Sequence, residues 1–306
     1  MTAVAEKISA DIDADFVAEK KTFEDRGFIG PFKLWEPEVM TAWWKEQRMA
    51  LLDPKNNERA VFQNPMNYDR HLDIPGLTRL VSEPALVRRF QNLIGPDVLC
   101  WRTEFFPKNP GDSGTGWHQV ETYNIAEGAE GMLEPTGREE GIPMELTAWV
   151  AFTEATIDNG CMRLIPGSHK SWHYNEKKKM QWDGAKDDNT FFGYDYSTLL
   201  LDKQSWDPDE QDYISAVMRP GEAIIFTARC VHGSHPNNSR KQRMGFSVRV
   251  VPPHVKVYNG MTEFTEFGHV FDLSNFGCVL IGGQDQYGLN RYLTENAWGE
   301  PFTTLN

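Results

Sequence analysis

Short apolar segments separated by glycine- and proline-rich turns fill the middle of the chain, and this pattern limits the possible folds most. The segments are Val98–Phe106, Leu146–Glu154, Cys161–Ile165, Glu222–Val231 and Gly245–Val251. Several short strands with turn signals between them are typical of an antiparallel sandwich or barrel. The sequence therefore predicts a mainly β fold with a jelly-roll core.

Helical patterns precede these strands. Apolar residues at helical spacing predict an amphipathic helix over residues 5–25, and further helices are expected over 37–52 and 84–94. A short strand is expected at residues 27–32. We expect a single domain spanning 1–306, with a helical N-terminal part (about 1–95), a jelly-roll core (about 96–255) and a C-terminal extension (256–306). Residues 170–215 are polar and irregular, which favours an insertion or a lid.

Composition excludes several classes of protein. The net charge of −13 disfavours nucleic acid as a partner, because an acidic surface repels phosphates. No apolar run is long enough to span a membrane, and the first 25 residues lack a signal-peptide core. The four cysteines form no CxxC pair, which favours reduced, mostly buried thiols. These features predict a soluble, cytoplasmic protein.

A histidine followed two residues later by an acid begins many two-histidine, one-carboxylate iron sites. Here His118 is followed by Val120, whose side chain has no atom that can bind a metal. His232, which follows an apolar segment, is the candidate second ligand, and we expect the two histidines to meet on facing strands. Arg249 would lie on the strand next to His232, and its guanidinium could bind a dicarboxylate such as 2-oxoglutarate.

Several blocks, in collinear order from about Phe23 onward, resemble the non-haem iron, 2-oxoglutarate-dependent halogenases of the syringomycin-biosynthesis type, in the phytanoyl-CoA hydroxylase-like superfamily. These blocks are Trp117–Gln119, Cys100–Pro107, Asn67–Asp73, Asn159–Cys161, Ile165–Gly167, Phe191–Tyr196 and Arg243–Phe246. The resemblance implies a double-stranded β-helix core of the jelly-roll, cupin-like kind. It also implies chlorination of an aliphatic amino acid held as a thioester on a peptidyl carrier protein, with Fe(II), 2-oxoglutarate, chloride and O2.

The resemblance assigns roles to individual residues. His118 and His232 match the iron ligands, Arg249 the arginine that holds 2-oxoglutarate, and Trp149 a tryptophan that hydrogen-bonds it; Arg243 belongs to the same set of cofactor-binding candidates. Thr147 and Arg249 match residues near chloride. The expected substrate pocket consists of Phe106, Tyr123 (a phenylalanine in the family), Phe192 and Ala228 (a serine in the family).

Val120 departs from both patterns, because the hydroxylases carry a carboxylate there and the halogenases alanine or glycine. Two imidazoles and a bidentate keto acid fill four of six octahedral positions and leave one for halide and one for O2. Valine supplies no oxygen ligand, but its methyl groups occupy space where a halide should bind, and overpacking costs about 1–3 kcal/mol. Glu121 is a poor substitute ligand, because a strand would turn its side chain away from that of His118.

Two alternatives to halogenation therefore stay open, together with the roles of three groups of residues. Val120 could exclude halide, so that the enzyme hydroxylates its substrate or consumes 2-oxoglutarate without oxidising it. The protein could also be a non-catalytic or impaired variant that keeps carrier binding. Arg249 could be structural, Lys177–Lys179 could be a solvated face or a docking site for an acidic carrier, and residues 191–196 could be core or a lid.

Overall fold

Strands from three separate parts of the chain form the large sheet around which the protein is built. The structure is a computed structural model that describes residues 15–60, 68–121, 123, 131–135, 145–178, 180, 195–266 and 269–306. The six-stranded sheet has the order β1-β8-β5-β10-β2-β14, and a four-stranded sheet has the order β3-β9-β6-β7. Two further pairs, β11-β4 and β12-β13, are small antiparallel ribbons.

The elements begin and end as follows. The α-helices are α2 (Phe16–Arg26), α3 (Pro37–Leu52), α4 (Pro54–Arg59), α5 (Pro75–Val81) and α6 (Pro84–Ile94), and the 3-10 helices are η1 (Arg70–Leu72), η2 (Ser168–Lys170), η3 (Tyr196–Leu199) and η4 (Pro208–Glu210). The strands are β1 (Phe28–Lys33), β2 (Val98–Lys108), β3 (Thr115–His118), β4 (Leu133–Glu134), β5 (Leu146–Ala151), β6 (Met162–Leu164), β7 (Ile214–Ala216), β8 (Glu222–Phe226), β9 (His232–Ser234), β10 (Arg243–Val251), β11 (Lys256–Val257), β12 (Glu263–Glu266), β13 (His269–Asp272) and β14 (Val279–Gly282).

The predicted helices at 37–52 and 84–94 and the strand at 27–32 are confirmed as α3, α6 and β1. The predicted helix at 5–25 corresponds to α2, whose N-cap Asp15 accepts a hydrogen bond from the Ala18 backbone N–H. Its predicted first half lies outside the described residues. Strand β1 from the N-terminal part and strand β14 from the C-terminal part both belong to the large sheet, so all three parts of the chain build one barrel.

The predicted strand at 222–231 is wrong in one respect. Strand β8 ends at Phe226, the chain turns through residues 227–231, and His232 begins β9 in the other sheet. The apolar segment is continuous in sequence because residues 228, 230 and 231 remain buried through the turn. An apolar run therefore marks burial here but not a single strand.

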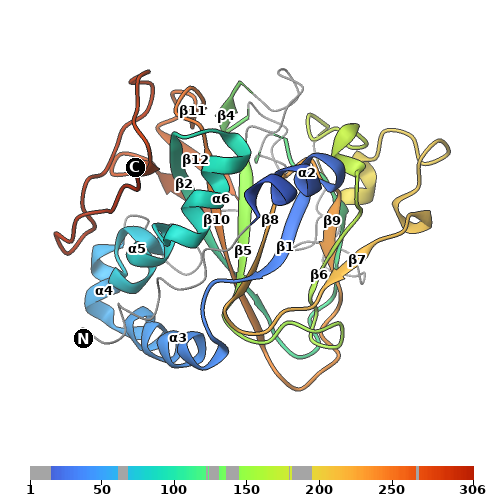
Figure 1. The fold of residues 1–306 in the computed structure, drawn as a ribbon, viewed down its shortest axis with the longest axis horizontal. Helices are drawn as coiled ribbons and strands as arrows, with labels where there is room; N and C mark the ends of the chain where they lie inside the picture. The colour runs from blue at the N-terminus through green and yellow to red at the C-terminus, as the bar shows by residue number, and fades with distance from the viewer. Residues whose placement is uncertain are drawn as a thin grey trace.

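Along each strand of the large sheet, successive side chains alternate between the two faces of the sheet. In β5, Leu146, Ala148 and Val150 pack in the cluster that contains the helices, whereas Trp149 and Ala151 pack with residues of the small sheet. Helices α3 to α6 lie on one side of the large sheet, and β6, β7 and β9 lie on its other side (Figure 1). Each strand of the large sheet thus presents one face to the helices and the other to the interior of the barrel.

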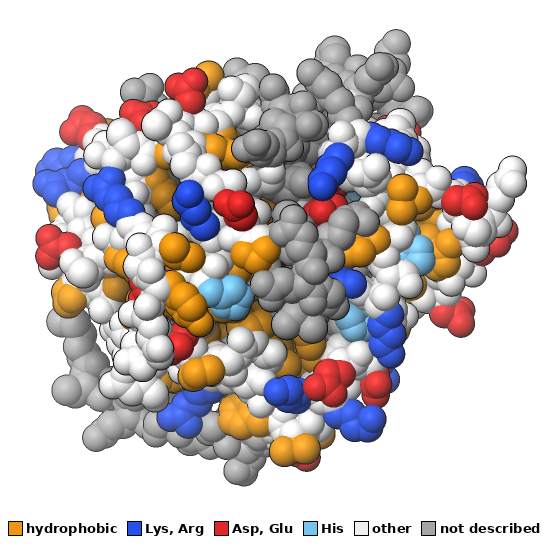
Figure 2. Space-filling model, turned by 90° about the horizontal axis from the view of Figure 1, so that it is seen from above, with side chains coloured by type: hydrophobic (Ala, Val, Ile, Leu, Met, Phe, Trp, Pro, Cys, Tyr) orange, Lys and Arg blue, Asp and Glu red, His pale blue; other side chains and the backbone are white. Residues whose placement is uncertain are grey.

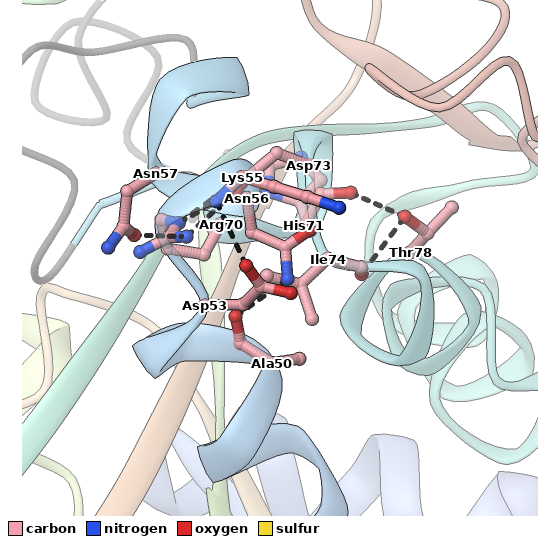
Figure 3. A network of polar contacts seen from close by, with 10 residues as sticks. All are labelled: Ala50, Asp53, Lys55, Asn56, Asn57, Arg70, His71, Asp73, Ile74 and Thr78. Atoms are coloured by element: carbon pink, nitrogen blue, oxygen red, sulfur yellow. Dashed lines mark hydrogen bonds and ion pairs between the residues drawn. The ribbon is translucent and has the colours of Figure 1, made fainter.

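Residues 68–73 connect the helical layer to the barrel. Asp69 accepts a hydrogen bond from the backbone N–H of Thr103 in β2, and Nδ1 of His71 lies 2.9 Å from the Thr103 hydroxyl oxygen. The Arg70 guanidinium lies 2.8 Å from the Asp73 carboxylate, and it also donates to the side-chain carbonyl of Asn57 in α4 (Figure 3). Thr78 in α5 donates to the backbone carbonyl of His71. Because the Asp73 side chain is fully buried, the ion pair neutralises a carboxylate that water cannot reach.

We expect Arg70→Met to lower the free energy of unfolding by about 3–5 kcal/mol, because it leaves the Asp73 carboxylate buried without its partner. Urea denaturation measures this loss. The matched control is Arg79→Met, which breaks a 3.4 Å pair with Glu300 whose side chains are 66% and 45% exposed. The control should cost less than about 1 kcal/mol, and equal losses in the two variants would contradict the assignment.

Candidate functional site

Two histidines meet on adjacent strands of the small sheet. His118 at the end of β3 is the cross-strand partner of His232 at the start of β9, and the ring centroids are 4.1 Å apart. The two residues were predicted to meet across facing strands, but they lie on hydrogen-bonded neighbours within one sheet. Both side chains are buried.

The orientation of both rings is fixed by backbone carbonyls. Nδ1 of His118 lies 2.8 Å from the Gly116 carbonyl, and Nδ1 of His232 lies 2.8 Å from the Cys230 carbonyl. Since a carbonyl only accepts, each Nδ1 carries the hydrogen and each Nε2 keeps its lone pair. Burial lowers the pKa of His118 to about 4 and that of His232 well below its usual value. The site therefore offers two neutral imidazole nitrogens, the form that binds a metal.

Both histidines line a cavity of about 120 Å³ between the two sheets. Every predicted site residue that the structure describes lines it: Phe106, His118, Val120, Tyr123, Thr147, Trp149, Ala228, His232, Arg243 and Arg249. The remaining one, Phe192, lies outside the described residues, as do residues 191–194 of the aromatic run. Tyr196 is described, and its ring stacks on His118 with centroids 4.2 Å apart.

The large sheet contributes a row of cross-strand partners to this cavity. Arg249 in β10 pairs with Arg102 in β2 on one side and with Thr147 in β5 on the other, and Thr147 pairs with Phe226 in β8. All four side chains reach the cavity, because residues in register share a face of the sheet. Arg102, Glu104 and Phe106 are alternate residues of β2, so one face of this strand lines the cavity.

Arg249 already has an anionic partner. Its Nη1 lies 2.8 Å from the Glu104 carboxylate, and both side chains are almost entirely buried. Glu104 raises the pKa of Arg249 against the opposing effect of burial. The prediction that Arg249 neighbours the strand of His232 is wrong, because β10 belongs to the large sheet and β9 to the small one. The two residues approach the cavity from opposite walls.

Arg243 is buried without a carboxylate partner among the described residues. It donates to the carbonyls of Gly160 and Phe106, its Nε has no hydrogen-bond partner in the described part of the chain, and its guanidinium lies 5.1 Å from the Trp149 ring. Burial lowers the pKa of Arg243 to about 10. Lys108, its cross-strand partner, has a pKa lowered to about 7 by burial. The carboxylate of Asp112 is close enough to oppose both shifts, but among the described residues it forms no ion pair with either cation. This end of the cavity therefore carries more positive than negative charge.

Val120 lies where a third protein ligand would be expected. Its backbone N–H donates to the Ala228 carbonyl, 2.9 Å away, and both side chains line the cavity. The neighbouring Glu121 is buried but lines a separate small cavity rather than the one with the histidines. Within the described ranges, no group of three or more His, Cys, Asp or Glu side chains could hold a metal ion. The described donor set therefore stops at two imidazoles.

Sequence reasoning missed several residues that line the same cavity. Thr115 and Ser234 are cross-strand partners whose hydroxyl oxygens are 3.1 Å apart, and Arg102 lies 4.6 Å from the ring of Tyr68. Thr115 lies three residues before His118, and Ser234 lies two residues after His232. A prediction that the two histidines lie on paired strands would therefore also have brought Thr115 and Ser234 together. Tyr68 reaches the cavity from the segment before η1, for which the sequence has no periodic signal.

Two other predictions can be compared with the structure. All four cysteines are buried and none forms a disulfide, as expected. A search of the described residues finds no helix long and apolar enough to cross a membrane.

Comparisons with known proteins agree on one family and one fold. A family model described as phytanoyl-CoA dioxygenase matches residues 23–245. An ectoine dioxygenase from Bordetella bronchiseptica is 26% identical over 248 residues, which cover 74% of this chain and 72% of that protein. The structure of CytC3 with Fe(II) and alpha-ketoglutarate is 36% identical with a TM-score of 0.72, covering 94% of this chain and 96% of that chain.

A more distant structure shares the fold alone. The non-haem monooxygenase ThoJ, in complex with Ni, has a TM-score of 0.58 at 20% identity, covering 90% of this chain and 86% of that chain. Together with CytC3 it confirms the predicted jelly-roll core.

Gly245 makes room for Trp149, and its replacement tests the geometry of this wall. A Cβ at position 245 would lie 1.8 Å from the Trp149 ring, so Gly245→Ala must displace the indole. We expect a loss of about 1–3 kcal/mol in the free energy of unfolding. Trp149→Phe in the same background should recover part of that loss, and fully additive losses in a double-mutant cycle would contradict the contact.

Proposed function

The chain belongs to the phytanoyl-CoA dioxygenase family of non-haem iron, 2-oxoglutarate-dependent enzymes, and on that premise we propose that it is a halogenase. It would chlorinate an unactivated aliphatic carbon of an aminoacyl group tethered to a peptidyl carrier protein. The observation that carries the proposal is the pair of neutral, adjacent imidazoles with a valine where a third ligand would stand.

The donor set fits Fe(II). His118 and His232 would hold the ion through their Nε2 atoms, since both Nδ1 atoms are engaged by backbone carbonyls. Bound iron with 2-oxoglutarate and O2 supplies the oxidising power that removes a hydrogen from an unactivated carbon. The protein would contribute the orientation of the ligands and a wall that decides which small ligand reaches the remaining position.

The cavity also fits 2-oxoglutarate. The resemblance assigns the distal carboxylate of this ligand to Arg249, and we propose Arg243 in its place. Arg243 and Arg249 are six residues apart on β10, about 20 Å along the strand, so they serve opposite ends of the cavity. Arg249 is neutralised by Glu104, whereas Arg243 is buried with an unused Nε–H donor. A buried guanidinium without a counterion favours an anionic ligand. Trp149, which lies beside Arg243, would pack against the same ligand.

Val120 would leave space for chloride. Val120 supplies no ligand atom, so one position on the iron would stay free of the protein. The cavity that Val120 lines together with both histidines has a total volume of about 120 Å³, which iron, 2-oxoglutarate and halide would share. Ala228, whose backbone carbonyl accepts the hydrogen bond from the Val120 N–H, contributes only a methyl group to the wall. Thr147 and Arg249 are the polar neighbours proposed for the halide. The aromatic rings of Phe106 and Tyr123 would face the aliphatic substrate.

The carrier protein is proposed from the resemblance of the sequence, and surface charge bears on how it would dock. Lys177 and Lys178 are exposed, and the adjacent lysine lies outside the described residues. Figure 2 shows one face of the molecule, on which basic and acidic side chains are interspersed around apolar ones. An acidic carrier would therefore dock through local basic side chains rather than one broad positive surface.

Hydroxylation is the second candidate. The two methyl groups of Val120 favour it, because the alanine or glycine of the halogenases leaves more space for a halide at this position. If these groups exclude halide, water or hydroxide takes the open position. The 26% identity with an ectoine dioxygenase is compatible with this chemistry. An impaired protein that retains carrier binding but holds iron weakly is the third candidate.

A chloride titration of the protein loaded anaerobically with Fe(II) and 2-oxoglutarate tests the proposal. We expect a visible charge-transfer band from the bound keto acid and a saturable shift of this band with chloride, because Val120 supplies no ligand and leaves a position on the iron for the ion. Bromide should give a similar saturable shift. A band that does not respond to either halide would favour hydroxylation, and no band at all would favour the impaired protein.

Product mass then separates the reactions. With a carrier-bound aminoacyl thioester, chloride should give a monochlorinated product, and omission of chloride should abolish it. The same amino acid offered free should react much more slowly if the carrier is the true partner.

The assignment of Arg243 predicts a different response from each arginine. Arg243→Lys should weaken 2-oxoglutarate binding about 10- to 100-fold, because a forked charge-assisted contact contributes about 1.5–3 kcal/mol. Arg249→Lys should weaken it about threefold or less. Anaerobic titration of 2-oxoglutarate into the Fe(II)-loaded proteins measures both, with urea denaturation as the control for folding. The reverse order would assign the distal carboxylate to Arg249.

A further inference from the structure

Glu145 is a buried carboxyl group that the proposed reaction has not yet used. It directly precedes β5, and its side chain faces a second cavity of about 20 Å³. Val120, Tyr123 and Ala228 line both this small cavity and the large one with the histidines. Glu145 therefore lies one layer of side chains behind the open position.

The contacts of Glu145 connect it to that position. Its Oε1 is 2.7 Å from the Thr147 hydroxyl oxygen, and its Oε2 accepts a hydrogen bond from the Ala228 backbone N–H at 3.2 Å. The Tyr123 hydroxyl also interacts with this carboxyl group. Thr147, Tyr123 and Ala228 are three of the residues that border the large cavity.

We propose that Glu145, acting through the Thr147 hydroxyl, is a specificity-determining residue that favours halide over water at the open position. The inference rests on the proposed function. The Thr147 and Glu145 oxygens can share only one hydrogen. If the carboxyl group is charged, Thr147 must donate to it and presents only lone pairs to the cavity. If the carboxyl group is neutral, it donates to Thr147, whose own hydrogen then points into the cavity.

The direction of this hydrogen bond matters because halide and water differ as partners. A halide ion only accepts hydrogen bonds, so it needs a donor such as the Thr147 hydroxyl. Water can donate to a lone pair or accept from a hydrogen, so it tolerates either arrangement. A neutral Glu145 thus selects for halide, and a charged Glu145 selects against it.

The surroundings favour the neutral form. The Glu145 side chain is buried, and no Lys or Arg of the described residues forms an ion pair with it. Burial raises the pKa of Glu145, whereas the contact with Thr147, the nearby Tyr123 hydroxyl, the charge of Arg249 and the Ala228 backbone N–H lower it. Across the small cavity the other charged groups are Glu121 and Arg229, and Glu176 accepts from the Glu121 backbone N–H. A halide in front of Val120 would add a nearby negative charge, which further favours the protonated carboxyl group.

Glu145→Gln and Glu145→Met separate this role from a packing role. In Glu145→Gln the amide oxygen must face the Ala228 N–H, since two donors cannot face each other, and the amide NH2 then donates to Thr147 permanently. Glu145→Met keeps a similar volume but removes the donor. Chloride titration of each variant loaded anaerobically with Fe(II) and 2-oxoglutarate, followed by the visible band, gives the Kd.

We expect Glu145→Gln to bind chloride within about threefold of the unaltered protein and Glu145→Met to bind about tenfold or more weakly. Thr147→Val should show the same weakening, and the double variant Glu145→Met/Thr147→Val should bind no more weakly than Thr147→Val alone. Glu121→Gln is the matched control, because it alters another buried acid of the small cavity that does not contact Thr147, and it should bind chloride normally.

Two results would overturn the inference while leaving the proposed function intact: equal chloride affinity in Glu145→Met and the unaltered protein, or additive losses in the double variant. An infrared spectrum of the metal-free protein provides an independent measurement. It should contain the carbonyl band of a protonated carboxylic acid that Glu145→Gln removes, and absence of that band would also overturn the inference. If the unaltered protein does not respond to chloride at all, the proposed function fails and this inference fails with it.

Discussion

Packing of the helices on one face of the large sheet is the interaction on which the rest of the structure depends. Phe90 of α6 and Met40 of α3 are fully buried in the same cluster as Val150 of β5 and Val248 of β10. Alternate side chains of a strand point to opposite faces of the sheet. The residues that alternate with Val150 along β5 and with Val248 along β10 therefore point into the interior of the barrel. A shift of one residue in register would exchange Thr147 and Arg249 with apolar residues, so the hydrophobic layer also fixes the position of the site.

The interior of the barrel contains more charge than an apolar core tolerates, and most of that charge is paired. Arg249 is balanced by Glu104. Burial raises the pKa of Asp69 to about 7, and the charge of Arg102 opposes this rise. At the other end of the cavity, Arg243 and Lys108 lie side by side without a balancing carboxylate in ion-pair contact among the described residues. Uncompensated buried charge is costly in a free protein, and a bound dianion removes that cost. This difference between the two arginines is the physical basis for assigning them different ligands.

Much of the fold could be predicted from the sequence because periodicity reports burial directly. The short apolar segment of β2 and the helices α3 and α6 could be predicted from their residues alone. The turn between Phe226 and His232 was not, because Ala228, Cys230 and Val231 stay buried after the chain leaves the large sheet. The histidine pair was found, but its arrangement was not, since strand order depends on contacts between distant segments. The role proposed for Glu145 could not be predicted, because an acid before an apolar segment usually marks the solvated start of a strand.

The local backbone explains how the site can lack a third protein ligand without losing its two histidines. Each imidazole is oriented by the carbonyl of the residue two positions earlier in its own chain segment, Gly116 for His118 and Cys230 for His232. Neither orientation depends on the side chain at position 120, which touches the site only through the wall that it shares with Ala228. A carboxylate at position 120 would therefore add a ligand but would not be needed to build the pair. The residue at this position can thus change the chemistry of the site while the orientation of the two imidazoles stays the same.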